Sequence, residues 1–200
     1  MARVVKYVNG SLVEYEVMKL VDFYDEILRK PTEPFDFNAP NAVREAEFIA
    51  YSLAETMQKY GGIGLSANQV GINKRVCAVA ADNKIWIMFN PIIIERSLTE
   101  SNLSEGCLSY PVLYVKVPRA EKIKVRFQAI GGQFTEQEVS GITAVCVQHE
   151  LDHLDGVVYT DRISPIKLEQ AKRKVKKNLK KISRLTVQEA EKLLANMKTA

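Results

Sequence analysis

The chain has 200 residues, of which 46% are hydrophobic and 26% are charged, and its formal net charge is +4. This balance excludes a disordered protein and a miniprotein built on disulfides. No apolar run approaches the roughly 18 residues that a membrane span needs, and the first ten residues contain no apolar segment of secretory type. Three widely spaced cysteines indicate a reducing compartment, so we expect a cytoplasmic protein, in the host-cell cytoplasm if the chain is viral.

The first third of the chain predicts a hairpin, a loop and a helix. Asn9-Gly10 interrupts a β-rich stretch at 4–17, which is the strongest short-range hairpin signal. The simplest expectation is that this hairpin adds to the edge of a sheet. Three prolines at 31–40 predict an extended loop, and Asn41 is expected to cap a helix that ends near residue 60. The expected buried stripe of that helix is Val43, Ala46, Ala50, Leu53 and Met57.

The rest of the chain changes from β to helical patterning. Strands are expected at 75–81, 85–89, 112–117 and 121–130. The period becomes helical between Gly141 and Gly156, and Ser164-Pro165 begins a further helix. Thr186 to Glu189 has the pattern of a capping box that opens a short last helix. The expected fold is α+β, with antiparallel strands around a central helix and helices at the C-terminus.

The positive charge is concentrated in the penultimate helix. Residues 167–184 hold nine lysines and arginines against one glutamate, so the remainder of the chain is acidic. Four cations recur every fourth residue and should line one face: Lys172, Lys176, Lys180 and Arg184. A second row is Arg173, Lys177 and Lys181, and a narrow apolar face is Val175, Leu179 and Ile182. The alternative is an ordinary solvated helix.

The two histidines of the chain belong to an H-E-x-x-H pattern. His149 and His153 share one face of a helix and can bind a single metal ion. Glu150 is turned by about 100° from His149, so it can reach a metal-bound water rather than the metal. Three residues continue the histidine stripe as an apolar face: Ile142, Val145 and Cys146. A chance match on a charged surface helix is the alternative.

Two further segments add candidate groups to this site. Catalytic metal sites usually hold the ion with three protein ligands, and Cys107 in EGCLSYP offers the third, although a buried structural cysteine is the commoner case. Residues 62–71, GIGLSANQVG, contain glycines that permit close approach of a ligand and an amide donor in Gln69. The segment lacks the Lys-Ser/Thr of a phosphate-binding loop, and a flexible connection is the alternative.

GIGLSANQVG, EGCLSYP and QHELDHLDG, in this order, resemble the three signature motifs of the peptide deformylases. The resemblance covers roughly residues 20–165 and includes Tyr24 to Arg29 and Val117 to Arg119. It implies metal-dependent hydrolysis of the N-formyl group from the initiator methionine of nascent peptides, with release of formate. It further implies a catalytic domain at 1–164 with a hairpin extension at 1–20, followed by a basic helical extension at 165–200.

The resemblance also implies the roles of individual residues. The metal ligands would be Cys107, His149 and His153, binding Fe²⁺ in the cell and often Zn²⁺ or Ni²⁺ in purified protein. Glu150 would be the general base and acid, and Gln69 and the backbone N–H of Leu108 would hold the oxyanion. The methionine pocket would be lined by Ile63, Gly64, Leu103, Ile142, Val145 and Cys146.

The chain departs from the family pattern at two positions. Ser66 stands where alanine is frequent, which we expect to be a small change. Tyr114 stands where many bacterial members have an arginine that holds the peptide, so we expect acidic substrates to gain little there. Some relatives dock on the ribosome by a C-terminal helix, and we expect Lys172, Lys176, Lys180 and Arg184 to contact ribosomal RNA in the same way.

Two other functions fit the sequence less well. A zincin-type protease takes its third ligand after H-E-x-x-H, but the chain beyond Gly156 has no His or Cys, and acidic candidates such as Asp161 or Glu169 leave EGCLS unexplained. A nonenzymatic RNA-binding protein would use the basic helix but has no need of Cys107 together with the histidines.

Overall fold

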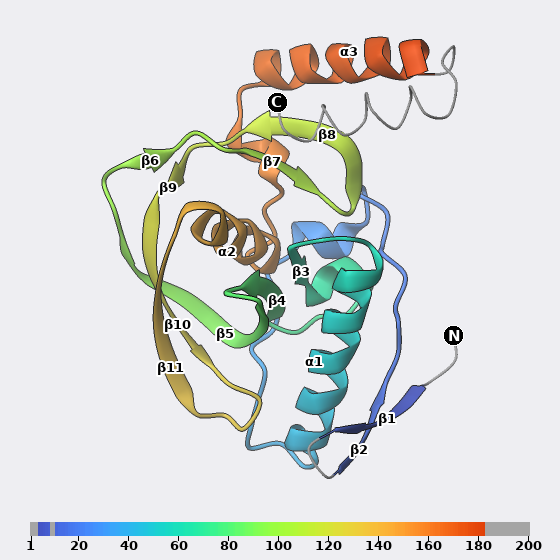
Figure 1. The fold of residues 1–200 in the computed structure, drawn as a ribbon, viewed down its shortest axis with the longest axis vertical. Helices are drawn as coiled ribbons and strands as arrows, with labels where there is room; N and C mark the ends of the chain where they lie inside the picture. Colours follow the sequence, from blue (N-terminus) through green and yellow to red (C-terminus); the bar gives the residue numbers. More distant parts are fainter. Residues whose placement is uncertain (1–3, 9–10, 183–200) are drawn as a thin grey trace.

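The computed structural model, which describes residues 4–8 and 11–182, has the expected α+β architecture (Figure 1). The helices are α1 (Ala42–Lys59), α2 (Gly141–Leu154) and α3 (Pro165–Ile182), with short 3₁₀ turns η1 (Glu26–Arg29), η2 (Ala67–Val70) and η3 (Tyr159–Arg162). The strands are β1 (Val4–Val8), β2 (Ser11–Tyr15), β3 (Gly64–Ser66), β4 (Val76–Ala81), β5 (Lys84–Arg96), β6 (Glu100–Ser101), β7 (Ser104–Cys107), β8 (Tyr110–Lys116), β9 (Arg119–Ala120), β10 (Lys122–Gln128) and β11 (Phe134–Ser140). No helix of the described ranges is long and apolar enough to cross a membrane.

Antiparallel strands surround the central helix. Five of them form one sheet in the order β11-β10-β5-β4-β3, and β7 and β8 form a separate hairpin. Figure 1 shows α2 in the middle of the molecule, with this sheet on one side and the β7–β8 hairpin on the other. From residue 144 to residue 154 the helix is therefore buried on all sides. The predicted central helix is confirmed, and its polar residues must find partners inside the protein.

The N-terminal hairpin forms where Asn9-Gly10 predicts it, but it does not join the main sheet. β1 pairs only with β2, in a two-stranded sheet that packs on α1. The chain after β2 is fixed to α1 by hydroxyl groups, because the backbone N–H of Glu16 donates to Ser52 (3.0 Å) and that of Met18 to Thr56 (2.9 Å). The expected addition to a sheet edge is therefore wrong.

Helix α1 has the predicted bounds but differs at its first turn. Asn41 has a left-handed φ of 62°, and its side chain makes no capping hydrogen bond. Val43, expected in the buried stripe, is 56% exposed, and Ala42 occupies the core position instead. A helical period counted from Ala42 leads to Ala46, Ile49 and the other buried residues of this face.

Helix α3 starts at Pro165, as Ser164-Pro165 predicts, and packs across β8. Leu168, Ala171 and Val175 are partly buried against the core cluster that contains residues of β8. Of the predicted docking face, Val175 is partly buried as expected, whereas Leu179 is 44% exposed. The predicted capping pattern at Thr186, as well as Arg184, lies outside the described residues.

Candidate active site

Three predicted metal ligands meet between α2 and the β7–β8 hairpin. The sulfur of Cys107 and a ring nitrogen of each of His149 and His153 all lie within 4.8 Å of one another, and the three residues are buried. Cys107 Sγ is 3.3 Å from His153 Nε2. The histidines lie side by side because they are four residues apart on one helix. One thiolate and two imidazoles form a donor set that suits zinc or iron, so these residues fit a metal ion.

A carboxylate outside the predicted set orients the first histidine. Glu105 Oε2 is 2.5 Å from His149 Nδ1, and both carboxylate oxygens also accept hydrogen bonds from Arg119 at 3.0 Å. Carboxylate partners of this kind fix the ring of a metal-binding histidine. Burial alone would raise the pKa of Glu105, but the hydrogen bonds from His149 and Arg119 outweigh it and lower that pKa. The sequence signal that could have identified Glu105 is its position two residues before Cys107, in the motif EGCLSYP.

The two histidines have opposite protonation preferences. Burial lowers the pKa of His149, but hydrogen bonds to Cys107 and Glu105 outweigh burial and raise it to about 10. Burial and then the charge of His149 lower the pKa of His153 well below its usual value. Within the described part of the chain, His153 Nδ1 is buried without a hydrogen-bond partner. The lowered pKa favours the neutral ring at His153, the form in which histidine binds a metal, whereas His149 would release its proton when an ion binds.

Glu150 lies beside the predicted ligands in a buried niche. Burial raises the pKa of its carboxyl group, and the Ser66 hydroxyl donates to Glu150 Oε2 at 2.6 Å. A β-carbon added at Gly64 would collide with Glu150 Oε1 and come within 2.6 Å of Cys146 Sγ. Ser66, expected to be a minor departure, thus contacts the predicted base directly. A motif comparison by itself does not reveal this hydrogen bond.

Gln69 and Leu108 face the same cavity as Glu150. Gln69 Oε1 accepts from the backbone N–H of Ser66 (2.9 Å), which aims the amide nitrogen at Cys107 Sγ (3.4 Å) and Ser109 Oγ (3.2 Å). Leu108 follows Cys107 in the turn between β7 and β8. The two predicted oxyanion donors therefore flank the sulfur ligand.

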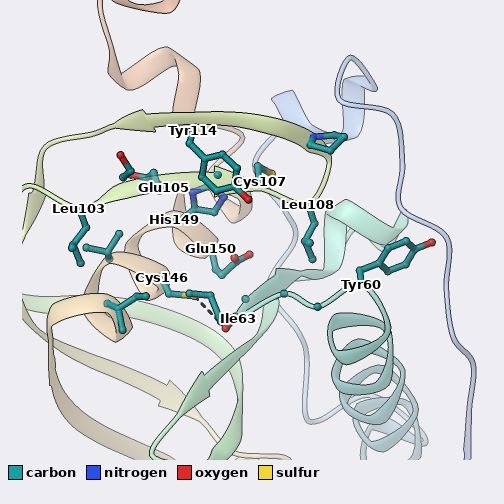
Figure 2. Close-up of a pocket in the computed structure, with 18 of the residues that line it drawn as sticks. Tyr60, Ile63, Leu103, Glu105, Cys107, Leu108, Tyr114, Cys146, His149 and Glu150 are labelled. Carbon is teal, nitrogen blue, oxygen red and sulfur yellow. Dashed lines mark hydrogen bonds and ion pairs between the residues drawn. The ribbon is translucent and has the colours of Figure 1, made fainter. Parts of the chain in front are cut away.

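The predicted pocket residues line one cavity of about 810 Å³. Val145 and Cys146 are buried in it, whereas Ile142 is 62% exposed and lies at its rim together with Ile63 and Leu103. Figure 2 shows Glu150 and His149 between Leu103 on one side and Leu108 on the other. Lining residues that the sequence did not single out are Tyr60, Asn102, Ser104, Val112 and Lys116. Tyr114 also lines the cavity, so the structure places it at the predicted substrate region.

Behind α2, the charges continue into an ion-pair network. Arg119 joins Glu105 to Asp152, with its Nη1 2.5 Å from Asp152 Oδ2, and Arg162 binds the same carboxylate through two hydrogen bonds. Arg119 and Asp152 are both buried, and their charges are compensated by one another. The network fixes α2 against β7 and η3.

Known proteins agree with this architecture. The family model described as polypeptide deformylase matches residues 17–169. The peptide deformylase of Thermotoga neapolitana is 39% identical over 148 residues, covering 72% of this chain and 86% of the relative. The crystal structure of peptide deformylase from Thermotoga maritima has a TM-score of 0.68 at 36% identity and covers 75% of this chain and 99% of the other. A Met-Ala-Ser-bound class I type b peptide deformylase from Acinetobacter baumannii has a TM-score of 0.68 at 32% identity, with 74% and 99% covered. The chain belongs to the polypeptide deformylase family of enzymes.

Proposed function

We propose that this enzyme removes the formyl group from the N-terminal methionine of nascent peptides and releases formate, using a divalent metal ion. The observation that carries the proposal is the meeting of Cys107, His149 and His153 beside the buried carboxylate of Glu150, at one cavity. A substrate that emerges from translation is consistent with action in the cytoplasm.

The three ligands would hold Fe²⁺ in the cell, and Zn²⁺ or Ni²⁺ could replace it in purified protein. Thiolate suits iron and zinc, and imidazole suits iron, zinc and nickel, so the donor set is compatible with these metals. A bound divalent ion would supply the Lewis acid that makes water nucleophilic near neutral pH. Glu105 would keep the ring of His149 in place through its hydrogen bond.

Glu150 would move the proton during hydrolysis. It takes a proton from the attacking water as the oxygen bonds to the formyl carbon, and it delivers that proton to the amide nitrogen as the carbon–nitrogen bond breaks. Burial raises the pKa of this carboxyl group. A raised pKa suits a carboxylate that must both accept and return a proton.

Gln69 and the backbone N–H of Leu108 would stabilise the negative charge that develops on the formyl oxygen. The hydrogen bond from Ser66 holds the Gln69 amide in one orientation before substrate arrives, so little reorganisation is needed. Loss of one such donor typically lowers turnover by about 10²–10³-fold.

The methionine side chain would occupy the part of the cavity formed by Ile63, Gly64, Leu103, Ile142, Val145 and Cys146. An unbranched thioether fits an apolar slot of this kind. The relative from Acinetobacter baumannii whose structure holds Met-Ala-Ser supports a pocket for peptides that begin with methionine.

The test is to separate metal loss from base loss. Cys107→Ala and His149→Ala should bind little metal, whereas Glu150→Ala should retain the metal and lose about 10²–10⁴-fold in turnover, because only proton transfer is removed. Metal content by mass spectrometry and formate release from a formyl-Met peptide are measured on iron-loaded protein prepared without oxygen. The assignment is wrong if Glu150→Ala turns over normally, or if the wild-type enzyme releases no formate.

We also propose that the basic side of α3 contacts ribosomal RNA. Lys176 and Lys180 are exposed. Lys172 Nζ lies 3.5 Å from Glu169 Oε1, and its side chain remains partly exposed. Several lysines in rows on a helix are suited to a phosphate backbone. Docking there would bring the enzyme to its nascent substrate.

A further inference from the structure

Strand β8 forms one wall of the active-site cavity with alternate side chains. Val112, Tyr114 and Lys116 line the cavity, whereas Leu113 and Val115 between them are buried in the core on the other face. This alternation is the ordinary period of a strand. Lys116 therefore shares the wall with Tyr114, the residue at the predicted peptide-holding position.

The register of the β7–β8 hairpin gives the distance of Lys116 from the metal ligands. Cys107 pairs with Tyr110 near the turn, and Ser104 pairs with Lys116 at the other end. Tyr114 lies over Gly106, where an added β-carbon would come 2.7 Å from its ring. Each strand residue advances about 3.3 Å, so Ser104 and Lys116 lie about 10 Å along the wall from Cys107. An extended peptide with its formyl group at Cys107 reaches this distance at about its third residue.

The charge of Lys116 is not neutralised within the described part of the chain. No carboxylate there pairs with it, and it is the one lysine or arginine among the residues that line the cavity. The two carboxylates of the cavity, Glu105 and Glu150, are buried, and each has its own hydrogen-bond donor. A positive charge therefore remains exposed at the mouth of the cavity.

We propose that Lys116 is a specificity-determining residue, which favours formyl-Met peptides with aspartate or glutamate at the third position. This inference rests on the proposed deformylase function and names a substrate class within it. An exposed ion pair contributes little, so the preference should be about two- to five-fold. It should appear in KM rather than in kcat, because the pair forms equally in the ground state and the transition state.

The experiment compares matched peptides with an amidated C-terminus, so that no terminal carboxylate contributes. Formate release is measured for formyl-Met-Ala-Asp and formyl-Met-Ala-Asn amides, and for formyl-Met-Asp-Ala and formyl-Met-Asn-Ala amides. The wild type should show the lower KM for aspartate in the first pair, and 0.5 M salt should remove the difference. Lys116→Gln should abolish the preference, and Lys116→Glu should reverse it.

The exposed residue Lys122, which lies on β10 outside the cavity, provides the matched control, and Lys122→Gln should keep the wild-type preference. An equal KM for both peptides of the first pair, a preference that survives in Lys116→Gln, or one confined to the second residue would overturn the inference. If no peptide released formate, the proposed function itself would fail. The two failures are thus distinguishable.

Discussion

Gly64 is the residue at which the backbone approaches the proposed base most closely. Gly64→Ala should displace the Glu150 carboxylate, because the added methyl group collides with Oε1 and is crowded by the Cys146 sulfur. Displacement of a catalytic group by about 1 Å can cost on the order of 10²-fold in rate, so we expect a loss of that size in kcat with metal content retained. Steady-state kinetics and metal analysis measure the two effects.

The matched control for this substitution is Gly131→Ala. The atoms nearest to a β-carbon there belong to the end of the Gln133 side chain, in the turn before β11, and that side chain can move away. Its kcat should equal that of the wild type. Normal kcat in Gly64→Ala would show that Glu150 tolerates displacement or does not act in the reaction.

Residue identities at the site are predictable where chemistry restricts the choice. Cys107, His149 and His153 form a donor set that could hold a metal ion, and three separated motifs point to it from the sequence. The roles of Ser66 and Glu105 are less visible, because serine and glutamate suit many positions. Only the tertiary structure shows that one contacts Glu150 and the other contacts His149.

At the scale of elements, the N-terminal hairpin is attached through a few buried side chains. Val13 is 5% exposed, so Val13→Ala should lower the free energy of unfolding by about 1–3 kcal/mol. Chemical denaturation measures this change. Turnover of short peptides should be unaffected, because the hairpin packs on α1 and does not line the cavity.

Val5 on the neighbouring strand provides the comparison for Val13. Its side chain is 56% exposed, and Val5→Ala should change the unfolding free energy by less than about 0.5 kcal/mol. Equal destabilisation by the two substitutions would mean that burial against α1 does not hold the hairpin in place.

Periodicity predicts each element well and its partners poorly. The hairpin, α1, α2 and the start of α3 follow from turn residues and apolar spacing, yet no local pattern says that the hairpin packs on α1. The same limit applies to β8, which is predicted as a strand at 112–117. A strand period of two puts Lys116 on the same face as Tyr114. Only the tertiary structure shows that this face lines the cavity.

At the scale of the whole molecule, the division at residue 165 stays a prediction, and α3 cannot simply be removed to test it. Leu168, Ala171 and Val175 pack against the core beneath β8, so deletion of 167–200 would uncover apolar surface near the active site. A loss of activity or ribosome binding after that deletion could then result either from the missing charges of α3 or from the disturbed packing beneath β8. Substitutions of exposed lysines keep the packing and remove only charge.

We therefore expect the triple variant Lys172→Gln, Lys176→Gln, Lys180→Gln to cosediment less with ribosomes while its kcat/KM on short formyl-Met peptides stays unchanged. Each lost phosphate contact should lower the slope of log affinity against log salt by about one, because fewer counterions are released. The charge-matched control neutralises three exposed lysines elsewhere, Lys19, Lys84 and Lys122. Equal binding and salt slope in the two triple variants would show that net charge, rather than this side of α3, attracts the ribosome.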